Sequence, residues 1–157
     1  KVMNQNDEVS LFADDSRHKL FLSDTGLFIT LAFKSKSFTD NVIYQKLLSD
    51  KLDANLGYVY ENVVAQMLKA SGKDLYYHTI LKLDGKGYYE IDFLLSDGSK
   101  VSPIEVKSSG YKAHTSLDKF SEKYSSRIAH KYLVYTKDLK KDGDTLCVPI
   151  YMVPLLP

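Results

Sequence analysis

The chain of 157 residues is long enough for one domain with a hydrophobic core, and its 44% apolar and 26% charged residues are ordinary for a globular protein. Its net charge of +1 gives no sign of binding a polyanion through overall charge, and a single cysteine, Cys147, excludes an internal disulfide and a thiolate metal cage. We therefore expect a cytoplasmic protein. The longest apolar run, near Gly26–Phe33, is too short to span a bilayer, so no contact with a membrane is expected.

Residues 1–52 are predicted to form an N-terminal extension with short helices. Asp24 is a suitable N-cap for a helix over Thr25–Phe33, and Val42–Ser49 is a second short helical segment. Because the chain starts at Lys1 rather than at methionine, we expect it to be a fragment of a longer protein.

The strongest predicted helix opens the second region, residues 53–157. Asp53 or Asn55 can cap this helix, and Ser71–Gly72 ends it. Glu61 lies beside its apolar stripe, and two interpretations stay open. This glutamate either lies at the edge of the core or directs its carboxylate towards a site on the strands that follow, and the helix alone favours the first. The stripe consists of Leu56, Val59, Tyr60, Val63, Val64, Met67 and Leu68.

Two strands joined by a tight turn carry the candidate catalytic residues. Side chains of a strand alternate between faces, so Asp92 is expected opposite to Phe93, and Glu105 on the same face as Lys107. The link Ser96–Ser99 contains Asp-Gly, which favours a hairpin that brings Asp92 near Glu105. We expect two carboxylates and an ammonium on one side of a sheet, a set of groups suited to Mg²⁺ and to the hydrolysis of a phosphodiester.

The order helix, strand, strand, strand, helix, strand predicts an α/β protein with a mixed sheet. The first three strands can pair as antiparallel neighbours, and the later helix permits a crossover to a parallel strand. No His-x-x-x-His or His-x-His pair occurs, which argues against a zinc site. The other predicted elements are a strand over Asp74–Leu83, a helix over Ser116–Tyr124, a strand over Ala129–Thr136, a charged loop over Lys137–Asp144, and a strand over Leu146–Val153 that Pro149 marks as an edge.

This order, with Glu61 on the first helix, Asp92 on the second strand and the Glu105-Val106-Lys107 run on the third, resembles the PD-(D/E)xK nuclease superfamily. The resemblance implies a restriction-endonuclease-like core, although the proline of the nominal motif is absent. It also implies that Asp92 and Glu105 bind Mg²⁺ or Mn²⁺, that the carbonyl of Val106 is a further ligand, that Glu61 completes the metal shell, and that Lys107 is the catalytic lysine.

Four phrases carry a closer resemblance: KLFLSDTGL at 19–27, YVYENVVAQML at 58–68, YEIDFLL at 89–95 and IEVKSS at 104–109. Together they resemble the C-terminal domain of unknown function of a family of bacterial and archaeal AAA-type ATPases. The resemblance implies an N-terminal ATPase module in the full-length protein. Gly72-Lys73 lacks the rest of a phosphate-binding loop, so this chain alone is not expected to bind ATP.

Two functions remain open at this stage. The first is a Mg²⁺-dependent nuclease domain that hydrolyses DNA under the control of a fused ATPase. The stretch Lys107–Lys141 has nine basic and three acidic residues, and its Lys112–Lys141 part would then bind phosphates. The second is a non-catalytic module that binds DNA or a protein, or that forms a homo-oligomer. Metal binding distinguishes the two, because only the first needs the acids.

Overall fold

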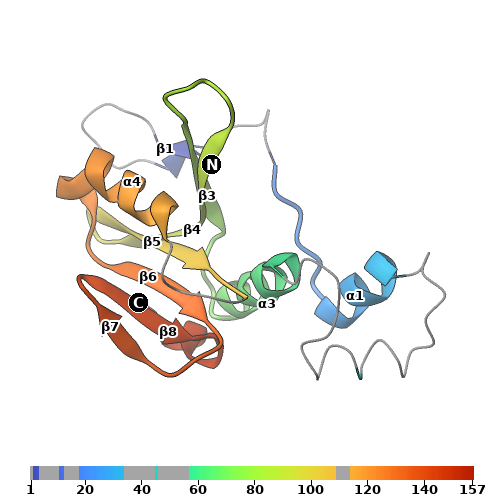
Figure 1. Ribbon diagram of the computed structural model, residues 1–157. Helices are drawn as coiled ribbons and strands as arrows, with labels where there is room; N and C mark the ends of the chain where they lie inside the picture. The colour runs from blue at the N-terminus through green and yellow to red at the C-terminus, as the bar shows by residue number, and fades with distance from the viewer. Residues whose placement is uncertain (1, 4–10, 13–17, 34–44, 46–56, 109–113) are drawn as a thin grey trace.

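The computed structural model describes residues 2–3, 11–12, 18–33, 45, 57–108 and 114–157. Six strands form its central sheet (Figure 1): β3 (Tyr76–Leu81), β4 (Tyr88–Asp97), β5 (Lys100–Val106), β6 (Lys131–Tyr135), β7 (Lys140–Asp142) and β8 (Thr145–Pro149). Their order is β3-β4-β5-β6-β8-β7. The pairs β3–β4, β4–β5 and β7–β8 are antiparallel, and β5–β6 and β6–β8 are parallel. Two short strands, β1 (Val2–Met3) and β2 (Leu11–Phe12), form a separate antiparallel pair.

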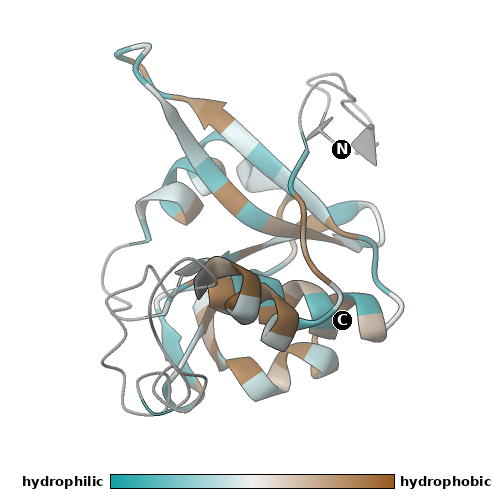
Figure 2. Cartoon of the chain, turned by 90° about the vertical axis from the view of Figure 1, so that its right-hand side faces the viewer, coloured by the Kyte–Doolittle hydropathy of each residue, from teal (hydrophilic) through white to brown (hydrophobic). Residues whose placement is uncertain are grey.

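Helices cover both faces of this sheet, which confirms the predicted mixed α/β class. The elements are α1 (Thr25–Phe33), α3 (Gly57–Ala70), α4 (Thr115–Tyr124) and two 3-10 helices, η1 (Ser125–Arg127) and η2 (Ile150–Leu155). α3 and η2 pack on one face, α4 packs on the other, and α1 lies against α3 (Figure 1). Apolar residues colour much of α1 brown in Figure 2, and its Leu27 and Leu31 are half exposed. Among the described residues, no helix is both long and apolar enough to cross a membrane.

The sheet separates two hydrophobic layers. Each residue of these layers is almost fully shielded from water, and burying one such side chain contributes about 1.5–3 kcal/mol. The larger layer, on the α3 side, includes Val64, Leu68, Phe93, Ile104, Val106 and Val134. The layer on the α4 side includes Ile91, Leu94, Leu117, Phe120, Tyr124 and Leu133. The core face that the sequence predicts for α4 is thereby confirmed.

A β-bulge in β4 sets the direction of Asp92. Between Leu94 and Ile91 the pairing with β3 advances by three residues of β4 but only two of β3, so Asp92 and Phe93 oppose a single residue. Ile91 and Leu94 both pack on the α4 side, whereas Phe93 packs on the α3 side. The strict alternation predicted for this strand is wrong at this point, because the bulge turns Asp92 to the same side as Phe93.

The ends of two helices follow the predicted local signals. The N–H of Leu27 donates to Oδ1 of Asp24 at 2.8 Å, so Asp24 caps α1 at its predicted start. α3 ends at Ala70, and Gly72 follows with a φ of 78°, a left-handed conformation that glycine adopts without strain. Of the predicted helix over Val42–Ser49 the structure describes only Gln45, which is helical, and the predicted N-terminal caps of the long helix lie outside the described residues.

The C-terminal part differs from the sequence prediction in two places. The charged segment predicted as a loop contains β7, which pairs with β8. The last strand ends at Pro149 and continues as η2 rather than as a strand to Val153. Pro149 does not mark an edge strand, because β8 lies between β6 and β7. β7 pairs with β8 only up to Cys147, so a residue without an N–H is tolerated beyond that pairing.

Candidate functional site

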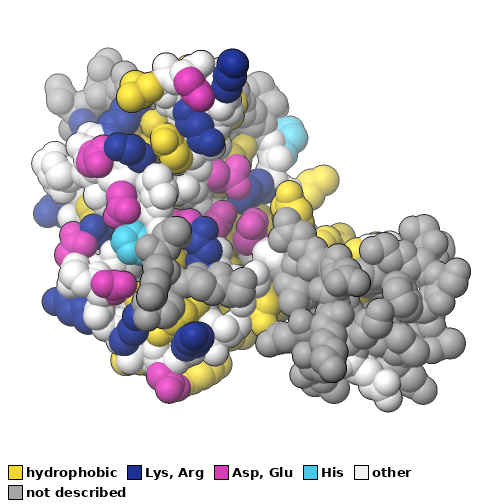
Figure 3. All heavy atoms as spheres, viewed as in Figure 1, with side chains coloured by type: hydrophobic (Ala, Val, Ile, Leu, Met, Phe, Trp, Pro, Cys, Tyr) yellow, Lys and Arg dark blue, Asp and Glu magenta, His cyan; other side chains and the backbone are white. Residues whose placement is uncertain are grey.

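Three carboxylates and one ammonium gather on the α3 side of the sheet. Glu61 of α3 and Glu90 and Asp92 of β4 have side-chain oxygens that all lie within 4.8 Å of one another. Nζ of Lys19 lies 3.3 Å from Oε2 of Glu61 and 3.6 Å from Oδ1 of Asp92, and it forms an ion pair with Glu90. Figure 3 shows acidic side chains beside lysines near the middle of one face. We call these four residues the acidic cluster.

Asp92 lies where β4 and β5 separate. The pairing of these strands begins at Phe93 and Ile104. Beyond it, Oδ2 of Asp92 accepts a hydrogen bond of 2.8 Å from the N–H of Val106. The carboxylate thus takes the place of a backbone carbonyl and satisfies a buried N–H, while its other oxygen faces Lys19. This double engagement fixes the position of the acid in the cluster.

Burial and neighbouring charge raise the pKa of Asp92 to about 7. Loss of solvation is the largest cause and the charge of Glu61 is the next, whereas the backbone hydrogen bond and Lys19 oppose the shift and Glu105 adds to it. Burial alone would lower the pKa of Lys19, but its hydrogen bond to Glu90 and the charges of Asp92 and Glu61 raise it. One ammonium therefore only partly neutralises the three carboxylates.

Glu105 and Lys107 form a separate pair at the end of β5. Nζ of Lys107 lies 2.6 Å from Oε1 of Glu105. Glu105 is in register with Leu133, which packs on the α4 side, so its side chain leaves the strand on the side opposite to Asp92. Within the described part of the chain, the buried Oε2 of Glu105 has no hydrogen-bond partner. A water molecule or a metal ion would satisfy that oxygen.

The structure brings together some of the residues that the sequence singled out and separates others. Glu61 and Asp92 share the acidic cluster. Glu105 does not join it but pairs with Lys107, which differs from the expected convergence of Asp92 and Glu105 on one side of the sheet. The bulge accounts for the difference, because it turns Asp92 towards α3. Val106 contributes its N–H to Asp92.

Two residues of the cluster, Lys19 and Glu90, were not predicted to belong to the site. Glu90 comes two residues before Asp92 on β4, and that spacing was a usable signal. Lys19 offered none, because 42 residues separate it from Glu61 in the sequence. The contact depends on how the segment before α1 crosses the long helix.

Residues 56–153 match the family described as a domain of unknown function (DUF4143). The chain belongs to the DUF4143 family. No curated protein and no solved structure matches the chain. The matched residues include every carboxylate of the acidic cluster and the Glu105–Lys107 pair, whereas Lys19 lies before them. The DUF4143 domain therefore receives the ammonium of its acidic cluster from the chain that precedes the domain.

The segment Lys19–Thr25, which we call the strap, is fixed to the DUF4143 domain by a buried asparagine. Asn62 of α3 accepts a hydrogen bond of 2.8 Å from the N–H of Leu22 and donates one of 3.0 Å to its carbonyl. The same amide donates to Oγ1 of Thr25 at 2.9 Å. Asn62 thus pairs with the backbone of the strap as a neighbouring strand would. These bonds satisfy the polar atoms of its side chain, which matters because Asn62 is only 2% exposed.

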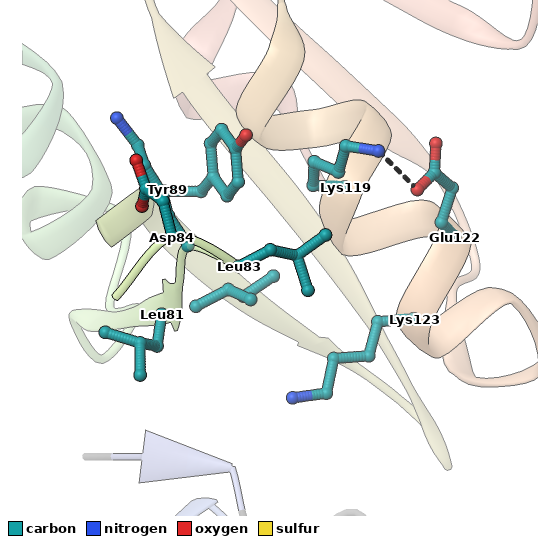
Figure 4. Close-up of a pocket in the computed structure, with 9 residues that line it drawn as sticks. Leu81, Leu83, Asp84, Tyr89, Lys119, Glu122 and Lys123 are labelled. Atoms are coloured by element: carbon teal, nitrogen blue, oxygen red, sulfur yellow. Dashed lines mark hydrogen bonds and ion pairs between the residues drawn. The ribbon is translucent and has the colours of Figure 1, made fainter. Parts of the chain in front are cut away.

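A hollow lies on the other side of the sheet from the acidic cluster, between the β3–β4 hairpin and α4 (Figure 4). Its volume is about 500 Å³. Leu81, Leu83 and Tyr89 line it from the hairpin, and Lys119 lines it from α4, where it pairs with Glu122 at 2.8 Å. None of the residues of the acidic cluster lines this hollow. Its charged residues are Lys82, Asp84, Lys119, Glu122 and Lys123, so this hollow is separate from the acidic cluster.

Proposed function

We propose that the DUF4143 domain is a Mg²⁺-dependent nuclease that hydrolyses the phosphodiester bonds of DNA. The position of Asp92 carries the proposal. This buried carboxylate lies beside Glu61 and is hydrogen bonded to the residue between Glu105 and Lys107. The order α3-β3-β4-β5-α4-β6, with antiparallel pairing followed by parallel pairing, supports a restriction-endonuclease-like core.

The carboxylates suit a hard divalent cation. Mg²⁺ binds oxygen ligands at about 2.1 Å in octahedral geometry, so two of its ligands lie about 3 to 4 Å apart. The oxygens of the acidic cluster, within 4.8 Å of one another, need only small shifts to meet that requirement. Asp92 and Glu61 would hold the ion together with Glu90, whereas Glu105 leaves β5 on the opposite side of the sheet. When bound, the ion would polarise the phosphate and lower the pKa of a water molecule.

We propose that Lys107, which pairs with Glu105 and not with the acidic cluster, acts on the substrate. Its side chain is 33% exposed, so a phosphate can approach its ammonium from solvent, and the same ammonium already contacts Glu105. A positive charge held there would stabilise the negative charge that develops on the phosphate as water attacks. Basic side chains elsewhere between residues 107 and 141 would contact the DNA backbone without reading its sequence.

A non-catalytic role is the second candidate, and Lys19 favours it. Its ammonium already supplies positive charge to the three carboxylates, so the domain has a counter-ion without a metal. A domain of this kind would bind DNA or a protein, or would form a homo-oligomer. Under either function we propose that it is the C-terminal part of an AAA-type ATP-binding protein, whose ATPase module regulates it.

Cleavage of single- and double-stranded DNA in the presence of Mg²⁺ or Mn²⁺ tests the nuclease proposal. Asp92→Asn and Lys107→Ala are each expected to reduce the rate by about 100-fold, because each removes a charge that the reaction needs. Glu122→Gln is the control, since this exposed glutamate pairs with Lys119 away from the acidic cluster. Cleavage at the wild-type rate by both site variants, or none by any sample, would contradict the proposal and leave the non-catalytic role.

A further inference from the structure

We propose that Lys19 is a further positioning residue of this site: its ammonium takes the place of a divalent cation in the acidic cluster and has to leave when a metal ion binds. The inference rests on the proposed metal-dependent function and adds to it a residue from outside the segment that matches the family. Three ion pairs from one ammonium, to carboxylates of α3 and β4, carry it.

The distances make the ammonium and a metal ion mutually exclusive. Nζ of Lys19 lies 3.3 Å from Oε2 of Glu61 and 3.6 Å from Oδ1 of Asp92. An ion at about 2.1 Å from carboxylate oxygens of the cluster would lie among the same oxygens and overlap with the ammonium. Two cations that close together also repel each other. The lysine therefore competes with the metal for the carboxylates.

The charge balance explains why a counter-ion is needed. The side chains of Lys19, Glu61 and Asp92 are 19%, 19% and 12% exposed, so water screens their charges only partly. Three carboxylates so close together repel one another when no cation lies among them. Lys19 reduces this repulsion and holds Glu61, Glu90 and Asp92 near the arrangement that a metal ion requires. In the metal-free protein the lysine thus keeps the site assembled.

The ammonium of Lys19 can move while the backbone of the strap stays in place. Asn62 fixes Leu22 through two hydrogen bonds, and the ring of Phe21 packs against that of Phe93 with centroids 5.5 Å apart. The backbone next to Lys19 is therefore held in place, while the long side chain of the lysine can rotate its ammonium out of the cluster. Because the strap precedes residue 56, a change in the upstream chain would alter how readily the DUF4143 domain takes up a metal.

Metal affinity of the full 157-residue chain tests this inference, with Mn²⁺ titrated in a calorimeter. Lys19→Met removes the charge while keeping the length of the side chain, and it is expected to bind Mn²⁺ at least about tenfold more tightly than wild type. Lys19→Gln, which can still hydrogen bond to the carboxylates, is expected to bind more tightly as well and serves if the first variant folds poorly. Lys69→Met is the control, because Lys69 pairs with Asp74 on the surface, away from the cluster.

Thermal unfolding in EDTA and in Mn²⁺ provides a second readout. Without metal, Lys19→Met is expected to unfold at a lower temperature than wild type, and Mn²⁺ is expected to raise that temperature more in the variant than in wild type. If Lys19 had a purely structural role, its loss would loosen the site. The variant would then bind Mn²⁺ more weakly than wild type.

The outcomes separate this inference from the proposed function. Equal or weaker Mn²⁺ binding by both Lys19 variants, with binding in all chains lost on Asp92→Asn, would overturn the role of Lys19 and leave the metal site standing. Tighter binding by the variants without DNA cleavage by any chain would support the role of Lys19 and overturn the nuclease. No binding by any chain would overturn both.

Discussion

Asp92 on the α3 side and His78 on the α4 side are both buried in the sheet, and the two faces treat them differently. Asp92 shares its surroundings with two other carboxylates and one ammonium. His78 contacts aromatic rings and a hydroxyl: its Nε2 lies 3.3 Å from Oη of Tyr124, and its ring meets that of Phe120 edge-on. Its Nδ1 has no hydrogen-bond partner in the described ranges. The buried acid lies among charged groups, whereas the buried histidine lies among aromatic rings.

The pKa values of the two residues express this difference. The pKa of Asp92 is raised to about 7, and burial and the charge of Glu61 are the main causes. The pKa of His78 is lowered to about 4 by burial and by the positive charge of Lys123. Both shifts favour the neutral side chain. A neutral histidine fits an apolar face, whereas a carboxylic acid that takes up a proton near neutral pH fits a site that lacks part of its counter-charge.

The two shifts affect stability in opposite directions. Between about pH 4 and 7 the folded protein binds more protons at Asp92 than the unfolded chain does, so this residue lowers the stability as the pH rises. Between about pH 6.5 and 4 the unfolded chain binds more protons at His78, so this residue lowers the stability as the pH falls. In the wild type the two effects on stability partly cancel. Variants are therefore needed to measure the contribution of Asp92 and that of His78 separately.

Asp92→Asn is expected to have the largest effect on the pH profile. It removes the loss of stability that Asp92 causes between pH 5 and pH 8, about 3 kcal/mol, because an amide does not titrate and can still accept the hydrogen bond from Val106. Urea unfolding of wild type and variant at four pH values in this interval measures the difference. Asp74→Asn, at an exposed surface position, is the control. A profile parallel to that of wild type would contradict the raised pKa.

His78→Phe is expected to remove the acid-sensitive part of the profile. Between pH 7 and pH 5 the histidine lowers the stability of the wild type by about 2 kcal/mol, and the variant should lack this loss. The same urea series, extended to pH 4.5, measures it. His130→Gln is the matched control, since the side chain of His130 is 63% exposed. If the control and His78→Phe changed the acid limb equally, the contrast between the two faces would fail.

Lys123→Gln is expected to give the smallest effect. Removing its charge raises the pKa of His78 towards its ordinary value, because Lys123 is the second cause of the downward shift. The acid-sensitive loss should shrink by about 0.5 kcal/mol or less, as for a partly screened surface charge. NMR titration of the His78 ring resonances is the more sensitive measurement. A downward movement of the titration midpoint in the variant would contradict this explanation.

Local signals in the sequence predicted the elements whose residues contact near neighbours in the chain. The Asp24 cap of α1, the glycine that ends α3 and the Asp-Gly turn between β4 and β5 depend on a few adjacent residues. The core face of α4 follows in the same way from its spacing. These predictions agree with the structure because no distant contact is needed to decide them.

The parts of the site that the sequence did not predict depend on distant strands and segments. The bulge at Asp92 exists only in relation to β3, so a strict alternation of side chains was the natural expectation. Lys19 reaches the carboxylates only because Asn62 holds the strap against α3. Glu61 had two interpretations on the helix alone, and its place beside Asp92 comes from the packing of α3 on the sheet. Whether it binds a metal stays a prediction.

Crystals of the 157-residue chain grown with Mn²⁺ offer the most direct test of the claim that the acidic cluster is a metal site. An anomalous difference map locates the ion without reference to activity. We expect a peak within coordination distance of Asp92 and Glu61, with the ammonium of Lys19 moved out of the cluster. A map without a peak there, with Lys19 still paired to the three carboxylates at saturating Mn²⁺, would contradict the account.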